Sequence, residues 1–581
     1  MAVEQLITQH IVTWTSALKT RSTSGRGSNG RIDLYGIKKL RELILELAVR
    51  GKLVPQDPND EPASELLKQI AKERDELVKS KVIRKPKTLE KITNSKIPFE
   101  LPDGWEWCYL NDIGNWGAGS TPSRSNSEYY NGNIPWFKSG ELSSDFISDS
   151  EETVTELALQ ECSLRDNNIG DVLIAMYGAT IGKTSILNVR GTTNQAVCAC
   201  TPYSGISNVY LLTLLKAYKR IFIGMGAGGA QPNISREKLI ATVFALPPKA
   251  EQNRIICKVH ELMSLCDQLE QQSLTSLDAH YQLVETLLAT LTASQNAEEL
   301  AENWARISQY FDALFTTEAS IDAFKQTILQ LAVMGKLVPQ DPNDEPASEL
   351  LKRIEHEKAQ LVKEGKIKKQ KPLPLVCDQE MPFELPKGWE WVRLGDIGTI
   401  SGGGTPSKNN EEYWSGDIPW VSPKDMKVDY ISTAELNISE LAVANSSVRI
   451  IPNNSILFVV RGMILAHTFP VAINLREVTI NQDMKSISSH LFNMDFLLYL
   501  MKGMSHQILG LVDRSSHGTC KLVSEKLFSL QIPLPPLSEQ GRINSRIAEL
   551  VLLCDTLKAR LQSAQQTQLH LADALTDAAL N

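Results

Sequence analysis

The chain contains two copies of one long module. Residues 47–70 read LAVRGKLVPQDPNDEPASELLKQI and residues 331–354 read LAVMGKLVPQDPNDEPASELLKRI, so two of these 24 positions differ across an offset of 284 residues. At the same offset, PFELPDGWEW (Pro98–Trp107) recurs as PFELPKGWEW (Pro382–Trp391). A repeat of this length is too long for a solenoid unit. Two similar modules on one chain predict a pseudo-two-fold protein that can engage two similar targets at once.

Composition places the chain among soluble proteins of a reducing compartment. The N-terminus is too polar for a secretory signal, and no apolar run approaches the length of a membrane span. Nine cysteines occur without a CxxC pair, and the histidines show no ligand spacing. We therefore expect a cytoplasmic protein with no disulfide framework, no metal site and no membrane contact.

Charge is distributed unevenly within each module. Pro98–Asp166 carries 3 Lys/Arg against 13 Asp/Glu, and Asn167–Val243 carries 7 against 2. In the second copy the counts are 5 against 10 for Pro382–Val448 and 8 against 5 for Arg449–Leu530. The net charge of −8 does not suggest nucleic-acid binding. If the basic residues of each module lie on one face, that face could bind the phosphates of a nucleic acid. An ordinary solvated surface explains the same counts.

Hydrophobic patterning divides the chain into five segments. Residues 1–97 are predicted helical, 98–248 and 382–536 mixed and β-rich, 249–381 a central helical region, and 537–581 a final helix. From Ala250 to about Ser294 apolar residues recur every three or four positions without Gly or Pro, which predicts a helix of roughly 65 Å. The C-terminal segment repeats the stripe. The simplest partner for each stripe is the other copy, in an antiparallel pair, and a core helix inside one large domain is the alternative.

Two glycine-rich strings resemble cofactor loops but lack the context that the chemistry requires. Gly224–Gly229 fits GxGxxG, yet a helix is predicted before it, a proline follows, and the second copy has no glycine there. Gly178–Thr184 has three residues between its glycines instead of the four of a phosphate loop. Glu364–Lys366 matches half of a nuclease motif without the rest of it. No nucleophile, metal or acid–base constellation appears, so the chain is predicted to bind rather than to catalyse.

Three short sequence patterns occur in the same order in both copies, six occurrences in all, and resemble those of one known family. They are G-x-TPS, YY/YW-x-G-x-IPW and LPP-x-x-EQ, at Gly119–Ser123, Tyr129–Trp136 and Leu246–Gln252, then at Gly403–Ser407, Tyr413–Trp420 and Leu534–Gln540. Together they resemble the specificity subunits of type I restriction–modification systems, in particular the longer family B branch. The resemblance implies an α+β fold, with two mixed β-rich target-recognition domains separated by a long antiparallel helical coiled coil.

The resemblance also implies a function and a set of partners. Each domain would read one half of a bipartite site in double-stranded DNA, and the coiled coil would fix the spacing. Two methyltransferase subunits would bring S-adenosylmethionine, and two motor–nuclease subunits would bring ATP and Mg²⁺, with no cofactor or catalysis in this chain. A rigid helix pair suits this role because base edges are read only by a surface held in register. The alternative is a scaffold that joins two copies of a partner protein without binding DNA.

Base-reading residues are expected where the copies diverge, between Phe137 and Arg236 and between Val421 and Leu522. Arg and Lys can bind guanine or phosphate in the DNA. The contact candidates within or beside these stretches are Arg124, Lys138, Lys183 and Arg236 in the first copy, and Lys408, Lys424, Lys427, Arg461, Arg514 and Lys521 in the second. The tryptophans shared by both copies are instead predicted to be core residues.

Overall fold

The chain forms two compact units. The computed structural model describes residues 3–21, 31–93, 95, 97–226, 232–365, 373, 381–514 and 519–580. Unit 1 consists of Met1–Lys19, Ile32–Leu274 and Gln565–Asn581, and unit 2 of Thr20–Arg31 and Thr275–Ala564. Residues 98–248 (domain 1) lie in unit 1, and residues 382–536 (domain 2) in unit 2.

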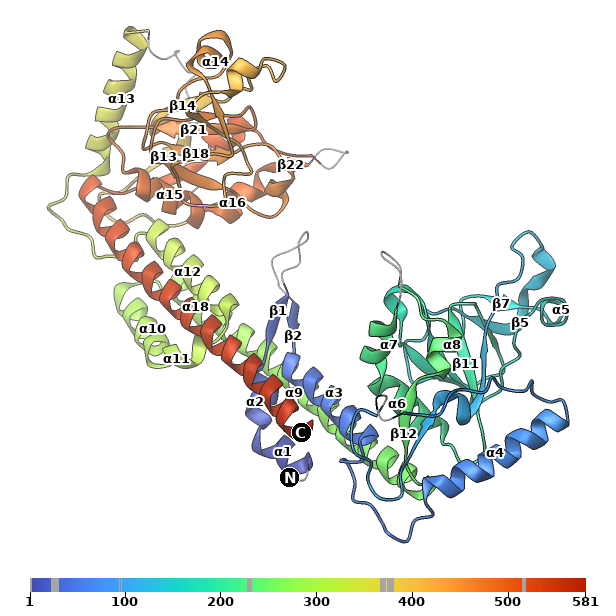
Figure 1. The fold of residues 1–581 in the computed structure, drawn as a ribbon. Coiled ribbons are helices and arrows are strands. Elements are labelled where there is room, and N and C mark those ends of the chain that lie inside the picture. The colour runs from blue at the N-terminus through green and yellow to red at the C-terminus, as the bar shows by residue number, and fades with distance from the viewer. Residues whose placement is uncertain are drawn as a thin grey trace. The chain divides into compact units, whose positions relative to one another are not determined.

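Domain 1 is built on a mixed five-stranded sheet of order β4-β11-β8-β9-β6 (Figure 1). The pairings are antiparallel except that of β6 with β9. A three-stranded sheet β10-β5-β7 and a two-stranded sheet β12-β3 complete the domain. The strands are β3 Glu106–Tyr109, β4 Gly114–Ala118, β5 Tyr130–Phe137, β6 Phe146–Ile147, β7 Thr153–Val154, β8 Val172–Ala175, β9 Thr184–Leu187, β10 Thr192–Thr193, β11 Val197–Pro202 and β12 Val243–Leu246.

Domain 2 repeats this topology. Its sheets have the orders β14-β21-β18-β19-β16, β17-β15-β20 and β13-β24, and a hairpin β22-β23 is added. The strands are β13 Glu390–Arg393, β14 Thr399–Gly402, β15 Ile418–Val421, β16 Tyr430–Ile431, β17 Leu436–Ile438, β18 Ile456–Val459, β19 Val471–Asn474, β20 Thr479–Ile480, β21 Met484–Ser488, β22 Val512–Arg514, β23 Cys520–Leu522 and β24 Gln531–Leu534. The central strands β8 and β18 are buried at every position, as the apolar runs in the sequence predict.

Helices form the remainder of both units. A short sheet pairs β1 (Lys19–Arg21) with β2 (Arg31–Asp33). The helices of the first repeat are α1 Val3–Gln9, α2 Ile11–Ser16, α3 Tyr35–Val49, α4 Ala63–Lys79, α5 Glu156–Glu161, α6 Asn208–Ala217, α7 Lys219–Met225, α8 Arg236–Ile240 and α9 Lys249–Ala293. Those of the second are α10 Ala297–Gln309, α11 Phe311–Leu314, α12 Glu318–Val333, α13 Ala347–Lys363, α14 Glu440–Asn445, α15 Met494–Gly503, α16 Ser505–Gly510, α17 Ser524–Phe528 and α18 Leu537–Leu580.

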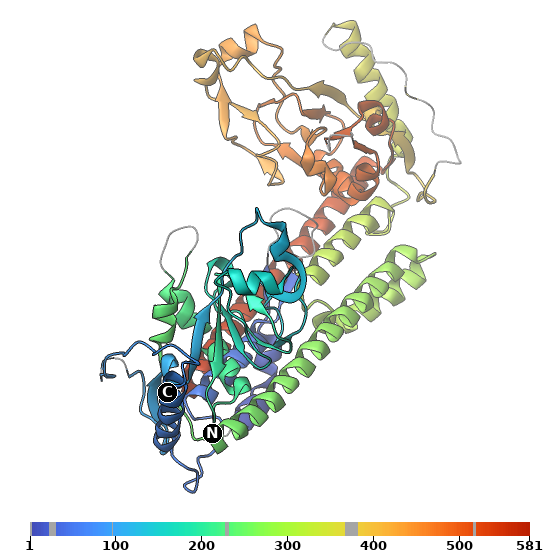
Figure 2. The ribbon, with the colours of Figure 1, turned by 90° about the vertical axis from the view of Figure 1, so that its right-hand side faces the viewer.

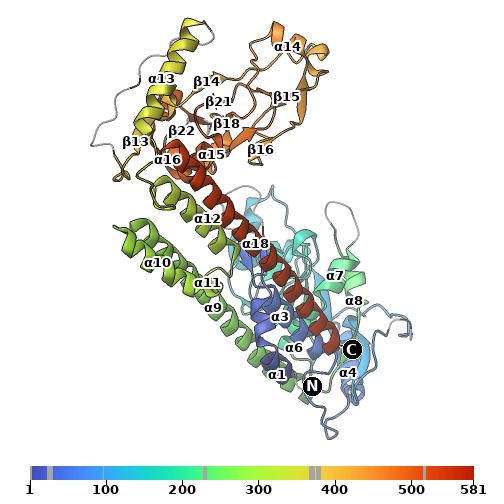
Figure 3. The same cartoon turned by 90° about the vertical axis from the view of Figure 1, so that its left-hand side faces the viewer.

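The two long helices α9 and α18 have 45 and 44 residues and confirm the helices predicted from the apolar stripes. Each also packs on a shorter helix that the stripe pattern alone does not reveal. In unit 1, Arg41 of α3 binds Asp267 and Glu270 of α9, at 2.8 and 2.6 Å. In unit 2, α12 lies alongside α18 (Figure 3), and Lys325 binds Asp555 at the equivalent place. These ion pairs tie each long helix to a shorter helix beside it.

The helices α4 and α13 complete the cores of their domains. Leu66 and Ile70 of α4 are buried in one cluster with Leu110 and Phe244 of domain 1. In unit 2, α13 lies along its domain as the yellow helix of Figure 2, and its Lys358 donates to the Gly395 carbonyl at 3.0 Å. The 24-residue repeat, which ends in these helices, thus has a structural role in both units.

The repeated strings converge at the start of each long helix. In unit 1 the carboxylate of Glu251, from the LPP-x-x-EQ string, accepts from Trp105 Nε1 at 2.9 Å and from Gln56 Nε2 at 3.1 Å. Arg254 binds Asp60 at 2.6 Å beside it. The three most similar strings of the two copies are thus parts of one buried junction that orients the long helix on its domain.

Unit 2 builds the same junction from the equivalent residues. Glu539 accepts from Trp389 at 2.9 Å and from Gln340 at 3.2 Å, and Arg542 binds Asp344 at 2.6 Å. The turn that delivers Gln340 begins at Gly335, whose φ is +67° and where an added Cβ would lie 2.4 Å from Pro386 Cγ. Only glycine fits both constraints, which explains why GKLVPQD is kept in each copy.

The hydrogen bond from Trp389 to Glu539 is expected to stabilise unit 2 measurably. Glu539 is 1% exposed, and burial raises its pKa while the bonds from Trp389 and Gln340 oppose the rise. We expect Trp389→Phe to lower the free energy of unfolding by about 2 kcal/mol, because a buried carboxylate loses a donor. Without the bond from residue 389, the pKa of Glu539 in the folded variant rises further. The loss of unfolding free energy should therefore be largest above that pKa, where Glu539 is charged. It should shrink as pH falls and Glu539 takes up a proton.

Trp391 supplies the matched control for this measurement. Its Nε1 is buried without a hydrogen-bond partner in the described part of the chain, so Trp391→Phe removes ring area but no hydrogen bond. Chemical unfolding of the full chain, followed at several pH values, compares the two variants. Equal losses of stability in both, independent of pH, would refute a specific role for the Trp389–Glu539 bond.

Candidate DNA interface

In domain 1, two of the predicted contact residues are held by one carboxylate. Arg124 and Lys138 both bind Glu152, each at 2.5 Å, and these two hydrogen bonds, that from Arg124 first, lower the pKa of Glu152 to about 2. The guanidinium of Arg124 also lies over the rings of Tyr130 and Trp136, at 4.7 and 5.3 Å. Glu152 thus already neutralises part of their charge in the free protein, and a DNA phosphate would compete with Glu152 for them.

The other two candidates of domain 1 have different neighbours. Lys183 precedes β9 and donates to the Gly140 carbonyl at 3.3 Å. Arg236 is the first residue of α8, is 45% exposed, and makes only a loose contact of 3.4 Å with Glu237. Within the described residues, neither of them shares an ion-pair partner with Arg124 or Lys138.

In domain 2, three candidates are isolated lysines. Lys408 follows the TPS string, and Lys424 and Lys427 follow β15. All three are exposed, and none takes part in an ion pair within the described residues. Side chains of this kind suit phosphate contacts, which position a protein on DNA without reading its sequence.

The remaining three candidates are brought together from segments 60 residues apart in the sequence. Arg461 pairs with Lys521 in an isolated antiparallel bridge, and Arg514 pairs with Cys520 in the adjoining hairpin β22-β23. Arg461 is 50% exposed, and its nearest acid is Asp483, at 3.8 Å from Nη1. This is the densest group of predicted contact residues in either domain.

The counterpart of this bridge in domain 1 was not among the predicted contact residues. Tyr177 pairs with Asn233 in an antiparallel bridge at the position equivalent to Arg461 and Lys521. Tyr177 is 40% exposed and Asn233 is also exposed. A search confined to basic residues misses both, although aligning the two copies at offsets of 284 and 288 would have pointed to them.

The acid-rich and base-rich halves of each domain are interleaved in the fold. Strands from the acid-rich half of domain 1 pair with strands from its base-rich half, as β4 does with β11. Ion pairs also join the halves: Arg190 binds Glu156 and Asp166, at 2.7 and 2.8 Å. In domain 2, Lys502 binds Asp429 at 2.5 Å in the same manner. Much of the basic charge is therefore compensated within the fold.

The four tryptophans that recur at the centre of the motifs are core residues, as predicted. Trp105, Trp136, Trp389 and Trp420 are all buried. Trp136 Nε1 donates to the Ser120 carbonyl at 3.1 Å, and Trp420 Nε1 to the Gly404 carbonyl at 2.9 Å. The IPW string thus holds the G-x-TPS loop in both domains. Trp107 and Trp391 are half-buried.

The strings that resemble cofactor loops lack the required strand–loop–helix setting. Gly224 and Met225 end α7, a helix, and the last three residues of the GxGxxG match lie outside the described residues. Gly178–Thr180 is a single 3₁₀ turn between β8 and β9, with no helix N-terminus to receive a phosphate. Lys366, the last residue of the ExK string, lies outside the described residues.

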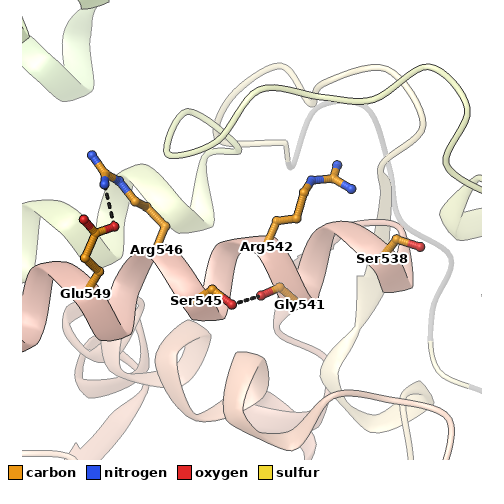
Figure 4. A pocket seen from close by; sticks show the side chains of 6 residues that line it. All are labelled: Ser538, Gly541, Arg542, Ser545, Arg546 and Glu549. Carbon is orange, nitrogen blue, oxygen red and sulfur yellow. Dashed lines mark hydrogen bonds and ion pairs between the residues drawn. The ribbon is translucent and has the colours of Figure 1, made fainter.

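A second exposed feature recurs beside each junction. On α18 an open groove is lined by Ser538, Gly541, Arg542, Ser545, Arg546 and Glu549, and Figure 4 shows these side chains along one face of the helix. Arg546 binds Glu549 at 2.6 Å, and on α9 the equivalent Lys258 binds Glu261 at 3.0 Å. Each face adjoins an exposed loop, residues 55–62 or 339–346, which reads PQDPNDEP in both copies. We call each loop with its helix face a junction surface.

No metal or membrane feature accompanies these surfaces in the described residues. Clusters of three or more His, Cys, Asp or Glu placed to bind a metal are absent there. Within the same residues, no helix combines the length and apolar composition needed to cross a bilayer.

Comparison with known proteins finds a family model that matches both repeats and relatives that match the whole chain. A family model described as "Type I restriction modification DNA specificity domain" matches residues 102–279 and again 386–566. The specificity subunit of the type I restriction enzyme EcoAI from Escherichia coli is 48% identical, and that of EcoEI from the same species is 47% identical, each over 100% of both chains. A chain from a structural study of type I R-M complex assembly aligns at 17% identity with a TM-score of 0.48, over 83% of this chain and 99% of that one.

Proposed function

Since the chain belongs to the family of type I restriction–modification specificity subunits, we propose that domain 1 and domain 2 each read one half of a bipartite site in double-stranded DNA. The chain is the sequence-recognition subunit of its system and is not itself an enzyme. The observation that carries the proposal is the double match to the specificity domain, one per repeat, on two domains of the same topology. The alternative of a scaffold without DNA recognition has no support in these matches.

Mapping of modified bases tests this function directly. The chain would be co-expressed with its methyltransferase partner in a host whose DNA is otherwise unmodified, and methylated adenines would be located by sequencing. The expected result is one asymmetric motif made of two short blocks with a constant spacer. A single continuous motif, or methylation without a motif, would contradict two-domain recognition.

The partners of a type I specificity subunit are DNA, methyltransferase subunits and restriction subunits. We propose that each chain binds two methyltransferase and two restriction subunits. The support is the pair of junction surfaces, which keep identical exposed loops although nearby domain surfaces have diverged. The loops bring carboxylates and each helix face brings one ion pair, so the two surfaces carry similar charges for the same kind of partner. S-adenosylmethionine, ATP and Mg²⁺ are assigned to those partners. A cytoplasmic location suits the eight unbridged cysteines in the described residues.

Native mass spectrometry of the complex with the methyltransferase is expected to show two methyltransferase subunits per chain. Arg546→Glu places like charge beside Glu549 and should lower the stoichiometry to one, as Lys258→Glu should on the other repeat, and both changes together should abolish binding. Arg306→Glu, exposed on α10 outside the junction surfaces, is the matched control. One methyltransferase per wild-type chain at saturation would refute the two-surface proposal.

A further inference from the structure

An isolated bridge occupies the same position in both domains and fixes two side chains side by side. In domain 1 the bridge between Tyr177 and Asn233 is flanked by two backbone hydrogen bonds. The Gly178 amide donates to the Pro232 carbonyl at 2.8 Å, and the Ile234 amide donates to the Met176 carbonyl at 2.9 Å. Because these bonds flank the pair, Tyr177 and Asn233 form a non-hydrogen-bonded antiparallel pair. In such a pair the two side chains project from one face at the closest spacing that a ladder allows.

Domain 2 has the same arrangement around different residues. Here the bridge joins Arg461 and Lys521. The Gly462 amide donates to the Cys520 carbonyl at 3.0 Å, and the Leu522 amide donates to the Val460 carbonyl at 2.8 Å. The backbone that carries the pair is therefore conserved between the domains while its side chains are not. A conserved support with variable residues is what two domains need in order to read different sequences in the same way.

Both pairs are anchored from behind and open to solvent in front. Met176 and Ile234, which flank the domain 1 pair, are buried, as are Val460 and Leu522 in domain 2. In contrast, Tyr177 and Arg461 are 40% and 50% exposed. Alternation along a strand turns the apolar neighbours into the core and the pair outward. The paired side chains are thus held side by side by the backbone bridge and face outward, where base edges could be met in a fixed register.

The chemistry of the two pairs differs in a way that matches base recognition. Arg461 offers the planar fork that binds the O6 and N7 atoms of guanine, and Lys521 offers a second donor. Asp483 lies 3.8 Å from the guanidinium, near enough to orient it. The Val460 amide donates to the Asp483 carbonyl, and the equivalent Met176 amide of domain 1 donates to the Ala196 carbonyl. Where domain 2 has Asp483, domain 1 therefore has Ala196. There, Asn233 is of the type that pairs with the N6 and N7 atoms of adenine.

Resting on the proposed function, we infer that Arg461 with Lys521 and Tyr177 with Asn233 are equivalent base-reading pairs. The pair in domain 2 reads a G·C pair in the second half-site, and the pair in domain 1 reads an A·T pair at the equivalent position of the first half-site. Arg514, on the hairpin strand beside Lys521, extends the contact in domain 2 to an adjacent position.

Exchanging the pairs tests the inference in the intact complex. The full chain with Tyr177→Arg and Asn233→Lys, bound to its methyltransferase, would be mapped for methylated sites beside the wild type. The original base at one or two adjacent positions of the first half-site should lose preference by roughly tenfold to a hundredfold, in favour of guanine. The second half-site should not change. The reciprocal exchange, Arg461→Tyr with Lys521→Asn, should alter the second half-site alone.

Smaller variants and controls keep every outcome informative. Arg461→Gln retains length but loses the charged fork, so it should relax the second half-site even if the double exchange fails to fold. Arg449→Ala, at an exposed residue of domain 2 outside the bridge, should leave base preference unchanged. Unchanged preference in the folded pair variants would overturn the inference, as would a change in both half-sites. A wild-type complex without any bipartite motif would instead refute the proposed function itself.

Discussion

Purified without partner proteins, the chain is expected to transfer no methyl group from S-adenosylmethionine to DNA and to bind none of the cofactor. The only strings that resemble cofactor loops sit after a helix, at Gly224, or in a 3₁₀ turn, at Gly178. Among the described residues, neither string follows a strand and opens a helix, the setting that presents backbone amides to an anion. Addition of the methyltransferase partner should restore transfer at the bipartite site, which makes this effect close to all-or-none.

Radiolabelled methyl transfer and calorimetric titration of the cofactor measure the two parts of this prediction. The partner alone serves as one control, since it should bind S-adenosylmethionine but modify DNA without the bipartite preference. A chain carrying Gly224→Ala serves as the other. It should assemble into an equally active complex, because Gly224 lies in helix α7, has no positive φ, and no atom lies within 4 Å of a Cβ added there. Cofactor-dependent methylation by the isolated wild-type chain would refute the prediction.

The sequence predicted the architecture because its signals are local and doubled. Each apolar stripe spans a whole helix, and the buried strands are continuous apolar runs, so their periodicity is visible without tertiary information. Because the module occurs twice, each motif could be checked against its counterpart in the other copy. The junction at Glu539 shows the limit of such reading: Gln340, Trp389 and Glu539 were recognised as members of repeated strings. That they share one hydrogen-bond network is visible only in the fold.

Contact candidates were harder to predict because the function of a basic side chain depends on its neighbours in space. Arg124 and Arg461 look alike in the sequence, yet Arg124 is held by Glu152 at 2.5 Å whereas Arg461 is 3.8 Å from its nearest acid. Tyr177 and Asn233 carry no charge and were passed over, although they occupy the same bridge as Arg461 and Lys521. Long-range pairing, which residue type does not encode, decides which side chains are presented together.

A fragment that ends near Asn296 is expected to form a two-fold dimer that recognises a palindrome built from the first half-site. In the intact chain, the end of α18 packs in unit 1, where Asp573 binds Lys39 at 2.8 Å and accepts from the Tyr35 hydroxyl at 2.8 Å. The fragment lacks α18, but the equivalent residue on α9, at the offset of 288, is Glu285. A second copy of α9, running antiparallel, would therefore bring a carboxylate to the same place.

The fit of this dimer has one identifiable defect, which supplies a graded test. Ala572 of α18 is fully buried, and its equivalent on α9 is Val284, so the dimer must accommodate extra methyl groups at a cost of about 1–3 kcal/mol. In the fragment, Val284→Ala should tighten the dimer, and Glu285→Lys should prevent it by facing Lys39 with like charge. Sedimentation measures the association, and methylation mapping with the partner reads the site. A monomeric Val284→Ala fragment, or a dimer that methylates the asymmetric site, would contradict the two-module architecture, because each module would then lack something that only the other provides.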